Sequence, residues 1–572
     1  MAGREDDSYA GRWIARLCGR VVAQGGTPEQ ARLAAQSRFK ETPEVVFMPN
    51  PYPLVFPPIL DSVRAALPDG LNVYLVGGAV RDALMGRPIH DLDFALAGNA
   101  MKVARHVADT LHADFYPLDT ERDTGRVIAT NADGTRMLMD FASFRRADPS
   151  AGSGRDPSTG SQHGLESDLT GRDFTLNAIA LDLKDNSLHD PLNGAMDLKE
   201  KRLRQCLPNA MQDDPVRILR GIRLAANFGF HILPETRAAM KAAAGRLGKV
   251  SPERLRDELF RIFDGPQPAA CLHALDLLGA LDQVLPELCM LKDVEQIPPH
   301  VHDVWEHTLS VLNHLEELLI ALAPVYNPAA AEDLLNGLLV LRIGRYRQQI
   351  GDELALHITA DRSLRSLLFM AAVYHDVAKP QSKKVDEAGQ MHFWEHDQQG
   401  AEILEKRARA LALSNDEILR LRIIVRNHMR IHFHTNRQVR DGKAPSRRAI
   451  YRFFRDTGPA GVDVCLLTLA DLRATYEQTL PQETWAAALD IVRTLLEAWY
   501  EKKEEQVSPP ILLDGNDLMR ELTLQPGPLI GKLLEAVREA QAVGDVSSLE
   551  QAKELARGRL KEEEDGKNIK HK

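Results

Sequence analysis

The sequence predicts an α/β (α+β) unit in the first half of the chain, followed by a mostly α-helical second half. In the first half, short apolar runs with the spacing of strands, such as residues 73–76 and 137–142, alternate with a segment of helical spacing at 99–111. From about His300 onwards, apolar residues recur at helical spacing and histidines become frequent. A chain of 572 residues is long enough for several domains.

Composition and charge narrow the possible classes of function. The formal net charge is −10, so any binding of nucleic acid must use a local basic surface. The first residues are acidic and contain no apolar stretch, which does not fit a secretory signal. No apolar run has the length of a membrane span. We therefore expect a cytoplasmic protein with no membrane partner.

Residues 1–54 are expected to form an N-terminal helical extension. Thr27 and Gln30 have the spacing of a capping box in front of an amphipathic segment. The proline-rich stretch that follows predicts an extended connection. Nothing in this segment suggests chemistry.

Residues 71–96, LNVYLVGGAVRDALMGRPIHDLDFAL, predict a site for a nucleotide and a metal. Gly77 and Gly78 end an apolar run, and glycines at a strand-to-helix turn let backbone N–H groups approach a phosphate, which Arg81 could also contact. Asp91 and Asp93 lie two residues apart in a short predicted strand, so their carboxylates point to one face. Mg²⁺ suits such a pair, because it binds one or two carboxylates together with substrate phosphates.

A lone Asp-x-Asp is usually a turn or a solvated strand, but the glycine turn at this spacing favours the metal site. A third carboxylate, Asp140, interrupts the apolar run 137–142. A charge there is costly to bury without a partner. Asp140 therefore lies either on a solvated edge or opposite the first two carboxylates, where it would share a metal and draw the proton from an attacking hydroxyl.

These segments resemble the head of the class II nucleotidyltransferases, the bacterial-type tRNA CCA-adding enzymes and bacterial poly(A) polymerases. The common pattern is a strand, then GG-x-VRD, then DLD. The resemblance implies two Mg²⁺ ions at Asp91 and Asp93, which activate the RNA 3′ hydroxyl and steady the pyrophosphate leaving group. It also implies that Asp140 is the base or a third ligand, and that Arg126 contacts the triphosphate.

A second motif supports the same resemblance. The segment DLTGRDFTLNAIALDL resembles the family's RRDFTxNA motif, with Arg172, Asp173 and Asn177 in place for nucleotide binding. Gly171 stands where the family usually has its first arginine, which leaves one phosphate or ribose contact without its usual donor. The Gly/Ser-rich segment 149–164 before it predicts a linker.

The segment DDPVRILRGIRLAANFGF, from residue 213, predicts one helix with a proline in its first turn. Asp214 and Arg217 would share a face of this helix, as in the family's E-D-x-x-R element, here with Asp in the Glu position. A carboxylate accepts from an exocyclic amino group and a guanidinium donates to a ring nitrogen, so this pair would accept cytosine and adenine and reject uracil and guanine. The alternative is a surface salt bridge. Arg220 and Arg223 follow Arg217 at intervals of three residues and would contact phosphates or RNA.

In the second half, histidines and aspartates follow the order H…HD…H…H…D on separate predicted helices. Such residues suit a hydrolytic divalent metal. The series resembles the HD phosphohydrolase superfamily, and the alternative is a set of unrelated core and surface histidines. The resemblance implies one metal held by His307, His375, Asp376 and Asp471. His396 and His428 would extend the site or hold a second ion, and Mg²⁺, Mn²⁺, Ni²⁺ and Fe²⁺ all remain open.

The expected domains are an N-terminal helical extension (1–54), a nucleotidyltransferase head (55–205), a neck and RNA-binding helical domain (206–299), an HD metal-dependent phosphohydrolase-like domain (300–475), and a C-terminal helical region and tail (476–572). Within the HD domain, the basic segment 426–455 predicts either an RNA-contacting surface or a solvated helical face.

The predicted function is template-independent addition of C and A, from CTP and ATP, to the 3′ end of tRNA. The resemblance implies that the HD domain hydrolyses a 2′,3′-cyclic phosphate or a 3′-phosphate that blocks a tRNA end. The nearest alternatives are a poly(A) polymerase and an enzyme that adds only A or only CC. An alternative from another class is an HD phosphohydrolase whose head is only an RNA-binding module.

Overall fold

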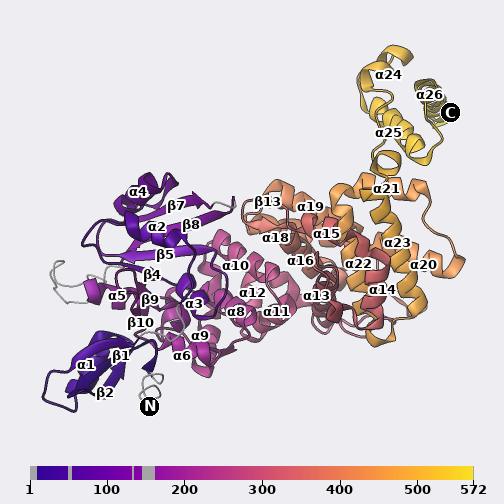
Figure 1. Cartoon of the computed structure of the whole chain (residues 1–572). Helices are drawn as coiled ribbons and strands as arrows, with labels where there is room; N and C mark the ends of the chain where they lie inside the picture. The colour runs from indigo at the N-terminus through magenta and orange to yellow at the C-terminus, as the bar shows by residue number, and fades with distance from the viewer. Residues whose placement is uncertain (1–8, 49–53, 132–133, 145–160, 571–572) are drawn as a thin grey trace. The chain divides into compact units, whose positions relative to one another are not determined.

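The computed structural model describes residues 9–48, 54–131, 134–144 and 161–570. The chain divides into two compact units, residues 1–247 and 248–572 (Figure 1). The division falls inside the predicted neck domain 206–299, so the first part of this segment packs with the head. Among the described residues, no helix is long and apolar enough to cross a lipid bilayer.

Residues 12–48 form a small antiparallel sheet with one helix, so the expectation of a helical extension is wrong. Strand β1 (Arg12–Leu17) lies between β2 (Arg20–Gly25) and β3 (Glu44–Met48), and α1 (Pro28–Gln36) packs on them. Strands β2 and β3 each contain two valines and β1 contains an isoleucine, and such β-branched residues favour strands over helices. Thr27 caps α1 as expected, because its hydroxyl accepts from the Gln30 N–H at 3.2 Å.

A seven-stranded mixed sheet organises the N-terminal unit, with strand order β10-β9-β4-β5-β8-β7-β6. Its strands are β4 (Val73–Val76), β5 (Asp91–Leu96), β6 (Asp114–Asp119), β7 (Thr124–Thr130), β8 (Arg136–Ser143), β9 (Ala180–Asp182) and β10 (Leu188–His189). Strand β5 pairs antiparallel with β4 and parallel with β8. The strands expected at 73–76 and 137–142 are confirmed.

Apolar packing explains why these strands lie in the centre of the unit. All four residues of β4 are buried, as expected for a central strand covered on both faces. The rings of Phe94 and Phe141 stack across β5 and β8 with centroids 4.6 Å apart. Helix α3 (Gly78–Leu84) follows β4, and α4 (Ala100–Leu111) packs on β7 and β8. Asn99 caps α4 by accepting from the Lys102 N–H at 2.8 Å, which confirms the helix expected there.

The predicted linker 149–164 lies mostly outside the described residues, and its last four residues begin helix α5 (Ser161–Thr170). Beyond α5, the helix predicted from residue 213 is confirmed from Arg217 onwards, but its predicted start is wrong. Helix α7 (Ala210–Asp213) ends before Asp214, and α8 (Arg217–Phe228) begins after Pro215. Asp214 has an extended backbone, with φ −144° and ψ 91°, because a residue before proline is disfavoured in the helical region.

Helices dominate the second unit. The helices that surround its predicted metal site are α13 (Val304–Ala321), α16 (Leu364–Tyr374), α18 (His396–Ala410), α19 (Asn415–Asn427), α20 (Met429–Asp441) and α22 (Gly461–Tyr476). Helix α22 is buried along almost its whole length and packs against α13, α19 and α20. A residue on α22 can therefore face residues from several helices at once.

The C-terminal helices α24 (Gly515–Leu522), α25 (Pro528–Val543) and α26 (Leu549–Lys570) lie together at the end of the chain (Figure 1). They share an apolar cluster of their own. Helix α25 packs against α21 (Arg447–Thr457), which carries part of the basic segment 426–455. Arg448 and Arg452 both pair with Glu539 of α25, with shortest distances of 2.9 and 2.8 Å. This part of the basic segment is therefore a docking face for the C-terminal helices.

Replacing Arg362 by alanine is expected to lower the free energy of unfolding of the second unit by ~3–5 kcal/mol. Arg362 donates from Nε and Nη2 to the fully buried Glu417 at 2.7 and 3.2 Å. The change therefore leaves a buried carboxylate without its positive partner, with only the hydrogen bonds from Ser414 and Thr359. Chemical denaturation measures the effect. Arg409→Ala is the control, because the exposed Arg409–Glu405 pair on α18 contributes only about 0.3–0.5 kcal/mol. Equal effects of the two variants would contradict the prediction.

Replacing Asp463 by asparagine is expected to flatten the dependence of stability on pH. Burial raises the pKa of Asp463 to about 7. The Arg420 Nη2 atom, 2.6 Å away, opposes this shift, but Glu353 contacts the same guanidinium and its negative charge adds to the shift. The unfolded carboxyl group releases its proton near pH ~4, so the wild-type free energy of unfolding falls as the pH rises from about 4 to about 7. The variant lacks this contribution. Parallel stability curves for the two proteins over this range would refute the assignment.

Candidate active site and metal centre

The glycine turn of the N-terminal unit lies directly beside a predicted metal ligand. Gly77 has a φ of +74° between β4 and α3, a conformation that glycine adopts without strain. A Cβ atom at this position would lie 3.1 Å from Nη1 of Arg172 and 3.3 Å from Oδ2 of Asp93. A larger side chain at residue 77 would therefore crowd Asp93 and Arg172, and glycine lets the backbone lie close to both.

Asp91 and Asp93 lie on β5, and Asp93 is opposite Val76 of β4 and Asp140 of β8 in the sheet register. Burial and the negative charge of Asp91 raise the pKa of Asp93 to about 6, with Asp140 adding to this shift and Arg172 and Arg220 opposing it. Carboxylates that disfavour each other's ionisation are stabilised by a bound cation. The residues present therefore fit a divalent metal.

Asp140 is held by an arginine on the neighbouring strand. Arg126 and Asp140 face each other in the β7–β8 register, and two N–H groups of Arg126 donate to the carboxylate at 2.8 Å each. This hydrogen bonding raises the pKa of Arg126. In the described part of the chain, Asp91, Asp93 and Asp140 do not converge as a single group of ligand atoms within 4.8 Å. Their roles in binding a metal, and that of Arg126 in binding triphosphate, stay predictions.

Residues of the two predicted nucleotide motifs form one hydrogen-bonded network. Arg81 donates to both oxygens of Asp82 at 2.9 Å and to Oδ1 of Asn177 at 2.9 Å. The Asn177 amide in turn donates to Asp173 at 3.0 Å, and Arg220 pairs with the other oxygen of Asp173 at 2.8 Å. Burial alone would raise the pKa of Asp173, but Arg220 and these hydrogen bonds hold it below its usual range. The network fixes the motifs relative to the glycine turn.

The predicted base-selecting pair is arranged differently from the prediction. Asp214 lies in the turn before α8, and the Nε atom of Arg217 is 4.0 Å from its Oδ2 atom, so the two do not share a helical face. The Arg217 guanidinium donates to the backbone carbonyls of Gly171 and Arg172 at 3.0 and 3.3 Å. Arg223 lies half-buried on α8. The turn before Pro215 thus brings the pair next to the RDFT motif.

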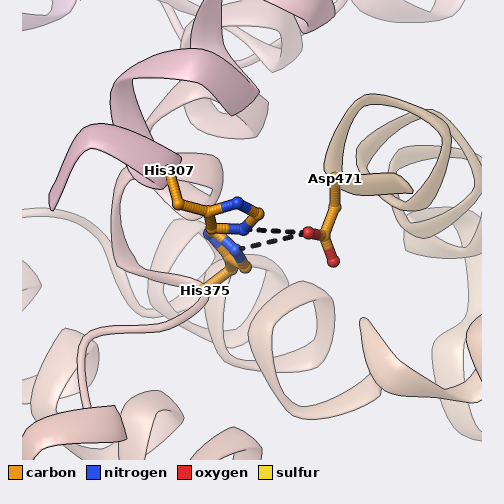
Figure 2. A group of neighbouring side chains, drawn as sticks. All are labelled: His307, His375 and Asp471. Carbon is orange, nitrogen blue, oxygen red and sulfur yellow. Dashed lines mark ion pairs between the residues drawn. The ribbon is translucent and has the colours of Figure 1, made fainter. Parts of the chain in front are cut away.

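In the second unit, His307, His375 and Asp471 come together from α13, the end of α16 and α22 (Figure 2). The Nε2 atom of His307 lies 3.0 Å from Oδ1 of Asp471, and that of His375 lies 3.9 Å from the same oxygen. Asp376 completes this set, because its Oδ2 atom is 3.1 Å from Nε2 of His375 and 3.6 Å from Nε2 of His307. The structure thus brings together the four residues predicted for one metal.

Asp376, His396 and His428 form a second group. Asp376 faces the first group with Oδ2 and this group with Oδ1. The Oδ1 atom of Asp376 is 3.3 Å from Nε2 of His396 and 3.9 Å from Nε2 of His428. The two imidazole Nε2 atoms are 3.3 Å apart. Burial and the neighbouring histidines lower the pKa of His428 to about 3, which keeps this imidazole neutral, as a metal ligand requires. One carboxylate that faces both groups suits a centre with two metal positions.

The orientation of the imidazoles supports metal binding. The Nδ1 atoms of His375, His396 and His428 lie 2.7, 2.8 and 2.6 Å from the backbone carbonyls of Ala372, Phe393 and Val425. Such a bond fixes the tautomer and leaves the Nε2 lone pair for a metal. The buried Nε2 atoms of His375 and His307 have no hydrogen-bond partner among the described residues. The donor set therefore fits a divalent ion.

Three residues of this centre were not predicted from the sequence: Lys379, His432 and His300. The Nζ atom of Lys379 lies 2.6 Å from Asp376, and Nε2 of His432 lies 2.8 Å from Asp471. His300 stacks edge-on against His307, and burial lowers its pKa to about 4. Lys379 follows Asp376 by three residues and His432 follows His428 by four. This helical spacing was a signal in the sequence that could have revealed both.

Burial alone would raise the pKa values of both aspartates in the centre. The neighbouring His375 and Lys379 hold the pKa of Asp376 well below its usual range, and His432 and His307 do the same for Asp471. Both carboxylates are therefore ionised at neutral pH and available to a cation.

Three family models match the chain. The Poly A polymerase head domain matches residues 73–204, the probable RNA and SrmB-binding site of polymerase A matches 229–291, and the HD domain matches 304–471. Each matched range lies inside one of the predicted domains, whose exact boundaries stay predictions.

Similar proteins extend the match to most of the chain. The chain is 31% identical to the A-adding tRNA nucleotidyltransferase of Deinococcus radiodurans over 488 residues, which cover 84% of this chain and 93% of the relative. It is 30% identical to the CC-adding tRNA nucleotidyltransferase of Thermus thermophilus, over 84% of this chain and 92% of the relative. The apo structure of a CCA-adding enzyme has the same fold, with a TM-score of 0.53 and 20% identity over 88% of this chain and 95% of that one.

The matches confirm the predicted class of protein: an enzyme with an α/β nucleotidyltransferase head, a mostly helical body and an HD domain. The chain belongs to the tRNA nucleotidyltransferase family.

Proposed function

We propose that the N-terminal unit adds C and A, from CTP and ATP, to the 3′ end of tRNA without a nucleic-acid template. The observation that supports this most is the contact between the glycine turn and Asp93, which brings a backbone phosphate site beside a carboxylate pair. The family membership supplies the class of reaction. Two relatives that match most of the chain bear the names A-adding and CC-adding tRNA nucleotidyltransferase.

Asp91 and Asp93 would hold Mg²⁺ in this reaction. Bound there, Mg²⁺ would supply the positive charge that activates the RNA 3′ hydroxyl and stabilises the pyrophosphate leaving group. The backbone N–H groups after Gly77 orient the triphosphate at the start of α3. Arg172 and Arg220 add positive charge close to Asp93. Asp140 receives the proton of the 3′ hydroxyl or serves as a third ligand, and Arg126 sets its orientation.

Asp214 and Arg217 would choose the base. A carboxylate accepts from the amino group of cytosine or adenine, and a guanidinium donates to the adjacent ring nitrogen. The hydrogen bonds from Arg217 to the carbonyls of Gly171 and Arg172 hold its guanidinium in one orientation. Uracil and guanine would leave two groups unpaired, and each unpaired buried group costs roughly 1–3 kcal/mol.

A second candidate is an enzyme that completes only part of the CCA end. The observation that favours it is that the two relatives named above bear names of partial activities, only A or only CC.

Incorporation of labelled CTP and ATP into three tRNAs tests the proposal: one without its CCA end, one ending in C and one ending in CC. CCA addition predicts C, C and A in order on the first tRNA, as read by sequencing of the product. Use of ATP alone on the tRNA ending in CC would show an A-adding enzyme, and an arrest after CC would show a CC-adding enzyme. Long A tracts on every substrate would show a poly(A) polymerase, and no incorporation would overturn the proposal.

We also propose that the HD centre hydrolyses terminal phosphate esters of RNA, namely a 2′,3′-cyclic phosphate or a 3′-phosphate. A divalent metal held by His307, His375, Asp376 and Asp471 would polarise the phosphoryl group and lower the pKa of attacking water. The ammonium group of Lys379 adds a positive charge beside Asp376. Two assays test this activity: conversion of a 2′,3′-cyclic phosphate end to a phosphomonoester, and release of inorganic phosphate from an RNA that ends in a 3′-phosphate. Absence of both with Mg²⁺, Mn²⁺, Ni²⁺ and Fe²⁺ would overturn it.

A further inference from the structure

We propose that Trp394 and His392 form an aromatic platform that binds the terminal nucleobase of the RNA whose phosphate enters the HD centre. The inference rests on the proposed hydrolysis of RNA ends, and it adds a recognition site for the base. The ligand is a purine or pyrimidine ring at the 3′ end of an RNA strand.

The exposure of Trp394 is the first observation. All five tryptophans of the chain lie in its described part, and Trp394 is the one that is exposed, with 55% of its surface accessible. Its ring stacks on that of His392 with centroids 4.7 Å apart and an interplanar angle of 11°. His392 thus covers one face of the indole ring, while more than half of the Trp394 surface is accessible.

The hairpin that carries the platform holds it rigidly. Strands β15 (Lys383–Val385) and β16 (Met391–Phe393) are joined by a turn in which Asp386 accepts from the Ala388 and Gln390 N–H groups at 2.9 and 2.8 Å. The same carboxylate lies 2.8 Å from Nε2 of His392. Asp386 therefore fixes the His392 ring, and the His392 ring fixes the plane of Trp394.

The position of the platform relative to the metal ligands is the second observation. Trp394 precedes His396 by two residues, a stretch of chain that spans at most about 7 Å, which is within the length of one nucleotide. Glu395 between them adopts a left-handed conformation, with φ 61°, and caps α18. This turn sends His396 into the buried centre while Trp394 stays at the surface.

Two basic side chains lie on the strand beside the platform, in a segment that also carries the acidic residues Asp386, Glu387, Glu395 and Asp397. Lys383 and Lys384 of β15 are exposed and lie opposite Phe393 and His392 in the hairpin register. Stacked bases on aromatic rings beside basic side chains are the usual means by which proteins bind single-stranded nucleic acids. Because every base has a flat face, the platform would read the presence of a base rather than its identity.

Binding of two matched RNA oligonucleotides to the full chain tests the platform. Both end in a 2′,3′-cyclic phosphate, and the terminal residue carries adenine in one and no base in the other. Binding is measured in EDTA, which separates it from hydrolysis, by the fluorescence anisotropy of a 5′ dye on the RNA, a signal that does not depend on Trp394. Stacking contributes roughly 1–3 kcal/mol per base, so the adenine-ended RNA is expected to bind about 5- to 150-fold more tightly.

Trp394→Ala is expected to remove this preference, so that both RNAs bind with the affinity of the abasic one, and Trp394→Phe should retain part of it. Tyr326→Ala is the control, because it removes a ring of similar exposure (51%) elsewhere on the second unit. If the HD centre hydrolyses these ends, Trp394→Ala should raise the KM of the adenine-ended substrate more than it lowers kcat.

Equal binding of the two RNAs to the wild-type chain would overturn the platform, as would a preference for adenine that survives in Trp394→Ala. Failure of hydrolysis alone, with the preference for adenine intact, would overturn the proposed phosphohydrolase activity and leave the platform as an RNA-binding site.

Discussion

Replacing Asp91 and Asp93 together by alanine abolishes nucleotide addition in our account, with a loss of at least about 1,000-fold in kcat. Divalent metal ions supply several kcal/mol of charge stabilisation in phosphoryl transfer, and each ~1.4 kcal/mol is a factor of ten in rate. Asp91 and Asp93 lie two residues apart on β5, Asp93 lies beside the Gly77 turn, and burial raises the pKa of this half-buried carboxyl group to about 6. Incorporation of labelled CTP and ATP measures the effect.

The control for this variant is Asp109→Ala, which removes an exposed carboxylate from α4 in the same unit and should leave incorporation unchanged. Release of phosphate by the HD centre should also survive in the double variant, since its ligands all lie in the second unit. Persistence of nucleotide addition in the Asp91/Asp93 variant would show that the metal assignment is wrong.

Replacing His375 by alanine should empty the HD centre of tightly bound metal and lower the release of phosphate by at least about 1,000-fold. His375 is fully buried, and its Nε2 atom faces Asp376 at 3.1 Å and Asp471 at 3.9 Å. Removing it takes one ligand from the set and opens a cavity beside two ionised carboxylates. Metal content after dialysis, measured by mass spectrometry, reports the loss independently of activity.

Nucleotide addition should persist in His375→Ala, because the carboxylates proposed for it lie in the other unit. The matched control is His273→Ala, which changes an exposed histidine on α11 (Pro268–Leu277). An unchanged metal content in His375→Ala would contradict the ligand assignment. Loss of nucleotide addition without loss of metal would contradict the separation of the two activities.

Local patterns explain which parts of the fold could be predicted from the sequence. Strand β4 and helix α4 are specified by short apolar runs and by the Asn99 cap, signals that do not depend on distant residues. The HD ligands could be found because histidine and aspartate in a fixed order leave few other interpretations. The sheet β1–β3 is harder to predict, because the capping residues Thr27 and Gln30 indicate a helix in this part of the chain. The valines of β2 and β3, on either side of α1, are the signal for strands.

Other differences arise from tertiary contacts that no local pattern contains. Pro215 breaks the predicted helix, but the bonds of Arg217 to the carbonyls of Gly171 and Arg172 depend on a motif some 45 residues away. The Arg126–Asp140 pair depends likewise on the register of β7 against β8. The side chains that contact the predicted ligands are therefore harder to infer from the sequence than the ligands themselves.

Anomalous diffraction from crystals grown with Mn²⁺ and a non-hydrolysable CTP analogue tests the central claim most directly. We expect anomalous peaks at the carboxylates of Asp91 and Asp93, and at least one further peak among His307, His375, Asp376 and Asp471. A bound nucleotide with no peak at Asp91 and Asp93 would contradict it.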